Sequence, residues 1–167
     1  RVAIPNGVTN IGERTFYKTG LLKIHIPGNV KKIGEDAFEY CENLFDVEFE
    51  EGLKKIEESA FAGCYSLTSI DLPDSIETIG IKAFSLCYNL SNVKLPSSLN
   101  VLNNDIFTSC FKLRKIEIPE GVERVELGAF NRCRKLKEIH FPKSMNYFYN
   151  DCAGDFINAP KLKRIFV

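Results

Sequence analysis

Residues 21–43 read LLKIHIPGNVKKIGEDAFEYCEN, and residues 44–66 read LFDVEFEEGLKKIEESAFAGCYS. The two stretches have the same length, and their apolar residues fall at the same positions. Blocks of this length continue without a gap at 67–89, 90–112 and 113–135. Self-similarity at a fixed period is the sequence signature of a repeat architecture, so each block is expected to form one structural unit.

The blocks follow the template L-x-x-I-x-I-P-x-x-V-x-x-I-G-x-x-A-F-x-x-C-x-x. The first, fourth, sixth, tenth and thirteenth positions are apolar in every block. The last two constant columns are Phe38, Phe61, Phe84, Phe107 and Phe130, and Cys41, Cys64, Cys87, Cys110 and Cys133. A single coil of this length cannot bury its apolar side chains alone, so the coils are expected to stack with equivalent residues above one another.

The two halves of the block predict different local structures. The segment L-x-x-I-x-I ends in the alternation of a short strand, and these strands should form a parallel sheet on one face of the stack. Pro at the seventh position ends each strand because it has no N–H for the ladder. In the second half, apolar positions three residues apart predict a short extended piece and then a helical turn at A-F-x-x-C.

This pattern resembles the BspA-like, or Treponema-type, leucine-rich repeats. Their mark is seen here as Ile26-Pro27, Val30, Ile33-Gly34, Ala37-Phe38 and Cys41. The expected fold class is therefore a repeat solenoid, α/β to mainly β, wound as a right-handed leucine-rich-repeat coil stack. The resemblance implies a protein that is secreted or held on a bacterial or protist surface. Members of the family are associated with adhesion to host matrix proteins and to other cells.

The repeats are expected to form a single leucine-rich-repeat domain over residues 1–167. Partial repeats at 1–20 and 162–167 flank the five full blocks, and block 136–161 carries an insertion of three residues. The chain starts at Arg1 inside the pattern, so we expect a fragment of a longer protein whose targeting signal lies elsewhere.

The cysteines recur at a constant step, which does not match the closely spaced ligand pairs of a zinc site. Cys packs as a small apolar side chain, so the column is expected to be buried. Neighbouring coils would bring these thiols within disulfide range, but every coil presents the same side chain to both neighbours. We therefore expect reduced thiols, with Cys152, outside the column, as the thiol most exposed to reaction.

The third and fifth positions of each block should point outward from the sheet and form its exposed face. Among these residues Asp46, Glu48 and Asp71 form an acidic spot, next to Glu50 and Glu51 at the strand end. Like charges on adjacent strands cost stability, so the spot is a candidate docking patch for a basic partner, or a weak cation site. The alternative is a solvated charged face that keeps the sheet soluble.

The long block supplies a second candidate contact region. Phe148 falls at the thirteenth position and should be core, so Tyr147 and Tyr149 should point away from the core. Exposed tyrosines on a loop are favoured contact residues because they offer a large rigid area with a polar tip. The alternative is a coil that adapts to the end of the array, where repeats are atypical.

Composition excludes several classes of function. Lys plus Arg is 22 and Asp plus Glu is 22 in 167 residues, so the chain lacks the basic excess typical of nucleic-acid binding. No apolar run approaches the roughly 20 residues that span a bilayer, so no direct membrane insertion is expected. The sequence contains no recognisable catalytic motif, and its two histidines, His25 and His140, fall five coils apart. We expect no enzyme activity, cofactor or metal.

These observations favour a monomeric, non-catalytic protein-binding or adhesion module of a secreted or cell-surface protein. Its partner would be a protein, such as a host matrix or cell-surface protein. One alternative is a structural spacer that presents another domain of a larger surface protein, and another is an enzyme whose active site lies outside this segment. Outward residues that vary from coil to coil favour the binding module over the spacer.

Overall fold

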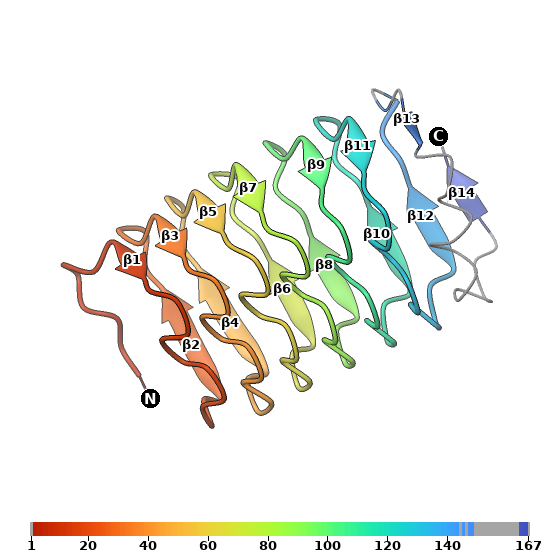
Figure 1. Cartoon of the computed structure of the whole chain (residues 1–167). Coiled ribbons are helices and arrows are strands. Elements are labelled where there is room, and N and C mark those ends of the chain that lie inside the picture. The colour runs from red at the N-terminus through yellow and green to blue at the C-terminus, as the bar shows by residue number, and fades with distance from the viewer. Residues whose placement is uncertain (1, 144, 146, 149–163, 167) are drawn as a thin grey trace.

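The chain winds into a stack of similar coils, with the N-terminus at one end and the C-terminus at the other (Figure 1). This computed structural model describes residues 2–143, 145, 147, 148 and 164–166. Strand pairing sets the register: Lys23 lies opposite Asp46, and Ile24 opposite Val47, 23 residues further on. The first coil is one residue shorter, since Asn10 pairs with Lys32, and the last is longer, since Glu138 pairs with Arg164. The predicted stacking of equivalent positions is confirmed.

The even-numbered strands form the face predicted from L-x-x-I-x-I. They are β2 (Lys23–Ile26), β4 (Asp46–Phe49), β6 (Ser69–Asp71), β8 (Asn92–Lys94), β10 (Lys115–Glu117), β12 (Glu138–His140) and β14 (Arg164–Phe166). All of their pairings are parallel, as predicted. Among the described residues the hydrogen-bonded ladders run β2-β4, β6-β8 and β10-β12-β14, with breaks between β4 and β6 and between β8 and β10.

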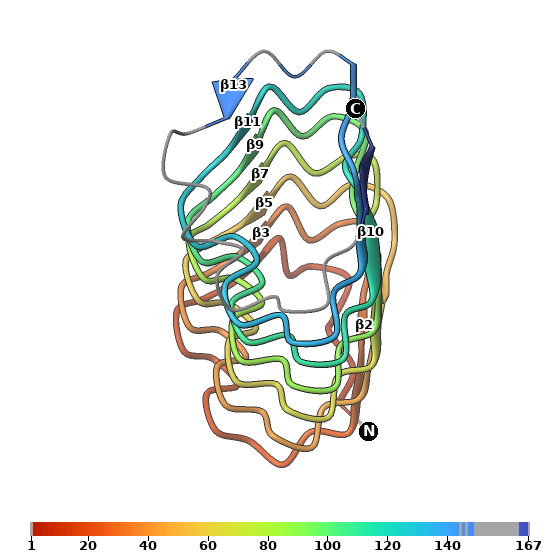
Figure 2. The same ribbon diagram turned by 90° about the vertical axis from the view of Figure 1, so that its right-hand side faces the viewer.

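The odd-numbered strands form a second parallel face, seen on the opposite side of the coils in Figure 2. They are β1 (Asn10–Ile11), β3 (Lys32–Ile33), β5 (Lys55–Ile56), β7 (Thr78–Ile79), β9 (Val101–Leu102), β11 (Arg124–Val125) and β13 (Tyr147–Phe148). They correspond to the short extended piece predicted for the second half of the block. Between the two faces lies the core of aliphatic, Phe and Cys columns.

The predicted helical turn at A-F-x-x-C is wrong, because the part of the chain that the structure describes contains no helix. The segment consists of successive tight turns in which Asp36 and Tyr40 adopt positive φ angles of 52° and 55°. Their N–H groups donate to carbonyls of the next coil, Asp36 to Glu58 and Tyr40 to Ala62. A helix would use these donors within its own segment, so bonding between coils replaces the helical pattern.

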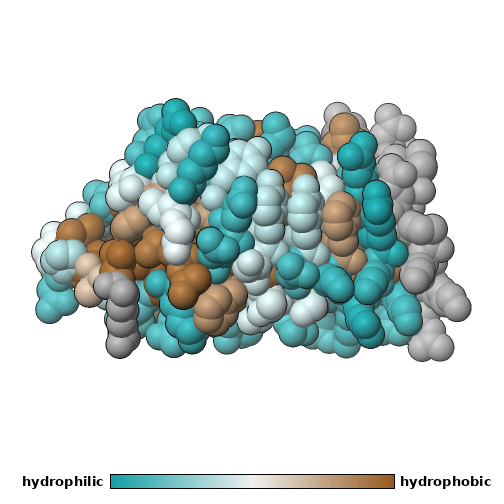
Figure 3. Space-filling view, turned by 90° about the horizontal axis from the view of Figure 1, so that it is seen from below, coloured by the Kyte–Doolittle hydropathy of each residue, from teal (hydrophilic) through white to brown (hydrophobic). Residues whose placement is uncertain are grey.

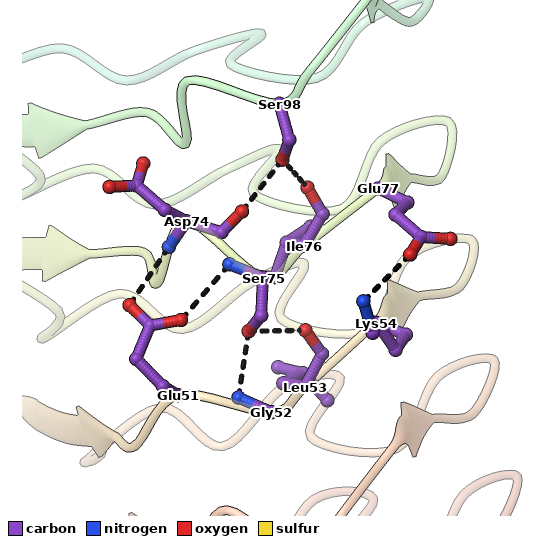
Figure 4. A network of polar contacts seen from close by, with 9 residues as sticks. All are labelled: Glu51, Gly52, Leu53, Lys54, Asp74, Ser75, Ile76, Glu77 and Ser98. Carbon is purple, nitrogen blue, oxygen red and sulfur yellow. Dashed lines mark hydrogen bonds and ion pairs between the residues drawn. The ribbon is translucent and has the colours of Figure 1, made fainter.

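Side chains at the proline corner connect the coils that carry Glu51, Asp74 and Ser98 (Figure 4). The Glu51 carboxylate accepts the backbone N–H groups of Asp74 and Ser75, at 3.1 and 3.0 Å. The Asp74 carboxylate in turn accepts the N–H and hydroxyl of Ser97, at 2.8 and 3.0 Å. The Ser97 backbone N–H lowers the pKa of Asp74, so the carboxylate stays charged and keeps this connection. β2 ends directly before Pro27, and β6, β8, β10 and β12 end two residues before their Pro, whereas β4 ends at Phe49 without one.

The cysteine column is buried, and its five thiols are free. Each thiol donates to the carbonyl oxygen of a Phe in the preceding coil: Cys64 to Phe38 at 3.3 Å, and Cys87 to Phe61 at 3.3 Å. Burial raises the pKa of Cys87 to about 12, so the thiol form is favoured. The expectation of a buried column of thiols is confirmed, whereas Cys152 lies outside the described residues.

Candidate functional site

The exposed face of the even-numbered strands carries the predicted acidic residues. Asp46 and Glu48 both point outward from β4, because the buried residue Val47 lies between them. Asp71 has the equivalent outward position on β6, next to the buried Ile70. The structure therefore brings these carboxylates onto one surface, as the periodicity of a strand requires.

Each of these carboxylates has a cationic or imidazole neighbour on an adjacent strand. Lys23 on β2 binds Asp46 at 2.9 Å, and Lys94 on β8 binds Asp71 at 2.9 Å. His25 lies 3.4 Å from Glu48 and 3.1 Å from Glu50, with one ring nitrogen toward each carboxylate. The acidic spot is thus flanked by basic groups on both sides, and the contacts across strands hold it in place. Exposed ion pairs of this kind contribute roughly 0–1 kcal/mol each.

The pairs leave the acidic spot open to solvent. The side chains of Glu48 and Asp71 are 69% and 76% exposed, and that of Asp46 is 37% exposed. A carboxylate has several acceptor positions, so a basic partner can bind without displacing Lys23 or Lys94. No group of three or more His, Cys, Asp or Glu residues able to hold a metal ion occurs in the described part of the chain.

An open groove crosses the same face, and Asp71 of the acidic spot is part of its lining. It has a volume of about 1060 Å³ and lies over β6, β8 and β10, where the ladder breaks. Lys94, Lys112, Arg114 and Lys115 contribute the cations of its lining. Asp71, Glu117 and Glu120 contribute carboxylates, and neutral amides and hydroxyls, among them Asn89 and Ser91, also line the groove. Apolar side chains such as Val93 and Leu95 complete the lining.

The N-terminal end of the face has a different character. A hollow there is lined by Leu21, Leu22 and Phe45, together with Phe16 and other residues. The side chains of Leu22 and Phe45 are exposed, at 57% and 40%. In Figure 3, which views the stack from below, hydrophobic residues gather toward this end.

The tyrosine region is only partly described. Tyr147 lies in β13, with its backbone opposite Arg124 of β11, and so belongs to a strand and not to the expected loop. The backbone of Phe148 lies opposite that of Val125, in the register expected for a core position. Tyr149 lies outside the described residues, so the pairing of Tyr147 with Tyr149 as contact residues stays a prediction.

Sequence reasoning missed a second aromatic column on the turns that precede the even-numbered strands. Tyr65, Tyr88 and Phe111 stack with ring centroids 4.8 Å apart, and Tyr40 meets Tyr65 edge-on at 6.3 Å. Arg134 covers the free side of Phe111, 4.7 Å from the ring centroid. The signal was available, because an aromatic residue occupies the twenty-second position in three consecutive blocks.

Comparison with known proteins identifies the class of this solenoid. The BspA type leucine rich repeat region matches residues 1–71 and 54–167 in six copies, so the chain belongs to this family. A comparison with curated proteins found no match. The described residues include no helix long and apolar enough to span a bilayer.

Solved structures support the same assignment. A leucine rich cell surface protein from Faecalibacterium prausnitzii is 29% identical, with a TM-score of 0.70 over 97% of this chain and 52% of its own length. A leucine-rich repeat protein from Bacteroides ovatus is 31% identical, with a TM-score of 0.64 over 84% of this chain and 43% of its own. The leucine rich repeat protein of T. pallidum is 24% identical and shares the fold, with a TM-score of 0.61 over 95% of this chain and 63% of its own. The chain thus spans about half the length of the F. prausnitzii protein.

Proposed function

We propose that this chain is a non-catalytic protein-binding module of a secreted or cell-surface protein and that it acts in adhesion. The observation that carries the proposal is the exposed face of the even-numbered strands. Its outward side chains sit at fixed spacing and differ from coil to coil: Lys23 and His25, then Asp46 and Glu48, then Ser69 and Asp71, then Asn92 and Lys94. An extended surface of this kind suits a protein partner, such as a host matrix or cell-surface protein.

The contact residues that we propose are Asp46, Glu48 and Asp71 for a basic segment of the partner, with Tyr147 and Tyr149 at the C-terminal end. The cell-surface description of the F. prausnitzii protein supports a surface location, and the repeat family supports a binding role. We propose that the module acts as a monomer without a cofactor.

A structural spacer is the second candidate, and the interior of the coils favours it. The Phe column is continuous, with rings from Phe38 to Phe130 stacked at centroid distances of 4.9–6.0 Å. The Cys column is equally regular. A uniform interior gives a stiff array that could hold another domain away from a cell wall. A spacer does not depend on the identity of its outward residues, which separates the two functions experimentally.

The test uses two matched substitutions in one coil. Ser69→Arg places a large charge in the middle of the proposed binding face on β6, whereas Thr78→Arg places the same group on β7, on the other face. Both residues are exposed strand positions, so neither change should affect folding. Binding is measured by surface plasmon resonance on immobilised fibronectin, collagen and laminin, and by attachment to intact host cells.

The proposed function predicts that Ser69→Arg lowers binding at least tenfold while Thr78→Arg leaves it within twofold of the unmodified chain. Equal binding by both variants, or no binding by the unmodified chain to any of these surfaces, would contradict it in favour of the spacer.

A further inference from the structure

One edge of the solenoid changes its charge along the stack. This edge consists of the turns that run from the Phe column into the even-numbered strands. In the first full coil it spans residues 38–45, with Glu39 and Glu42 and no cation. In the next two coils it spans residues 61–68 and 84–91, which carry no charge. Residues 107–114 and 130–137 then carry only cations.

These last two segments form a basic edge, defined here as Lys112, Arg114, Arg132, Arg134, Lys135 and Lys137. Residues one repeat apart lie on neighbouring coils, so these cations come close to one another in pairs. In one such pair the backbone N–H of Lys137 donates to the carbonyl of Arg114 at 2.8 Å. Like charges on neighbouring coils, about 4.8 Å apart, repel one another. Lys112, Arg114 and Lys137 are exposed and form no ion pair within the described residues. The arrangement therefore costs stability, as expected of a surface that binds an anion.

The basic edge continues into the groove over β6, β8 and β10. Lys112 and Arg114 line the groove together with Asn89, Ser91 and Asn92. The Asn89 amide is held by a 2.8 Å bond to the carbonyl of Tyr65. Amides and hydroxyls both donate and accept hydrogen bonds, as the hydroxyl groups of sugars require, whereas Arg and Lys pair with sulfate or carboxylate groups.

Two other anionic partners fit less well. Nucleic-acid binding without sequence preference uses aromatic faces on which bases stack, but here the faces of Tyr88 and Phe111 cover each other and Arg134 covers the end of the column. Acidic protein partners are usually anchored by exposed apolar side chains. On this edge such side chains are Leu22 and Phe45, which lie in coils far from the basic residues.

We propose that the basic edge and the adjoining groove form a binding site for an acidic polysaccharide whose sugars carry sulfate or carboxylate groups. The groove shares Ser69 and Asp71 with the proposed protein-binding face, whereas the basic edge lies outside that face. Because the variants that test this proposal change only residues of the basic edge, either proposal can fail alone. Clusters of Lys and Arg on a protein surface bind such polyanions mainly through charge, and the amides and hydroxyls that line the groove add hydrogen bonds to sugar hydroxyl groups.

The probe is a size-defined heparin oligosaccharide, titrated against the intact chain by calorimetry at about 0.15 M NaCl, where the Debye length is about 8 Å. Poly-L-glutamate, single-stranded DNA and uncharged dextran of similar length are the comparison ligands. The unmodified chain should bind heparin at least tenfold more tightly than polyglutamate or DNA and should not bind dextran. Absence of heparin binding, or equal affinity for polyglutamate or DNA, would overturn the proposal.

Matched variants locate the site. The triple change Lys112→Gln, Arg114→Gln and Lys137→Gln should lower heparin affinity at least tenfold. The control Lys54→Gln, Lys55→Gln and Lys82→Gln removes the same charge from other surfaces and should change affinity less than threefold. Similar losses of heparin affinity in the two triple variants would show that only the net charge of the chain matters, and would overturn the assignment of the site to this edge. Comparison of ligands on the unmodified chain remains decisive if a triple variant fails to fold.

Discussion

Replacing Phe84 by Ala tests the packing that holds the coils together. The Phe84 side chain is fully buried in the centre of the Phe column. Its ring stacks on Phe61 at a centroid distance of 5.4 Å and on Phe107 at 5.9 Å, with interplanar angles of 6° and 13°. The substitution therefore removes a buried ring and two ring contacts, and it leaves a cavity between rigid neighbours.

The expected cost follows from these losses. Core Phe→Ala substitutions cost about 3–5 kcal/mol, and each aromatic pair contributes about 0.5–1.5 kcal/mol within such totals. Two pairs and complete burial place Phe84→Ala in the upper part of that range. Domains are typically stable by about 5–15 kcal/mol, so this one change would remove a large fraction of the total.

Urea unfolding at 25 °C, followed by far-ultraviolet circular dichroism, measures the loss. Phe16→Ala is the matched control, because Phe16 is half-buried and its ring stacks on Phe38 at the N-terminal end of the column. It should cost less than about half as much, since burial is the larger part of the effect. A loss below about 1 kcal/mol for Phe84→Ala, or equal losses for the two variants, would refute the reasoning.

Three further predictions concern other columns. Gly34→Ala should lower the midpoint of urea unfolding, because the added Cβ would lie 2.7 Å from the backbone nitrogen of Glu13. Gly20→Ala is the control and should leave the midpoint unchanged, because nothing lies within 4 Å of its added Cβ. Equal midpoints for the two variants would contradict the close approach of the coils. The five thiols of the Cys column should resist a thiol reagent at about pH 8 in the folded protein and react fully in urea. The reason is that burial raises the pKa of Cys87 and of Cys133 to about 12. If the thiols of the folded protein reacted as fast as those of the unfolded protein, the column would be accessible and the prediction wrong. Hydrogen bonds from Lys32 and from Lys55 lower the pKa of Glu57 below its usual 4.5, so its carboxylate stabilises the fold above that pH and the contribution is lost as the pH falls through the folded-state pKa. The difference in melting temperature between the unmodified chain and Glu57→Gln should therefore shrink on acidification from pH 7 to pH 3, and a constant difference would contradict this role.

Much of the fold could be predicted because the sequence repeats, so a structure inferred for one block applies to every coil. A strand of alternating residues such as Lys23 to Ile26 must face inward at Ile24 and Ile26, and stacking places each equivalent pair in register. The Cys and Phe columns followed from the same argument. The insertion of three residues in block 136–161 also agrees with the observed pairing of Glu138 with Arg164.

The error at A-F-x-x-C has a physical cause. Spacings of three between apolar residues fit a helix and a series of tight turns equally well, because both return the side chain to the same face. The choice depends on where the backbone N–H groups go, and here Phe38 donates to Ala60 in the next coil. A pattern read along one chain contains no information on that partner.

The candidate site was predicted in position but not in its contacts. The outward direction of Asp46, Glu48 and Asp71 follows from strand alternation, and the structure agrees. Their bonds to Lys23, His25 and Lys94 depend on the rotamers of long side chains, which strand alternation does not specify. The basic edge was missed because each cation was considered within its own coil and not along the stack.

The central claim is that residues one repeat apart lie directly above one another along the whole array. Pulsed electron paramagnetic resonance between spin labels at Lys32→Cys and Arg124→Cys, in a chain with Cys152→Ser, measures this directly. These positions lie on β3 and β11. Strand pairing joins β3 to β5, β5 to β7 and β9 to β11, and the Asn103 amide donates to the Ile79 carbonyl across the break between β7 and β9. Four strand spacings therefore separate the labels, or roughly 19 Å between backbones. A single narrow distribution near that distance, allowing for the label arms, is expected if β7 and β9 adjoin as the stack requires. A broad distribution, or a distance that does not shorten when the second label is moved to Thr78, would contradict the stacked solenoid.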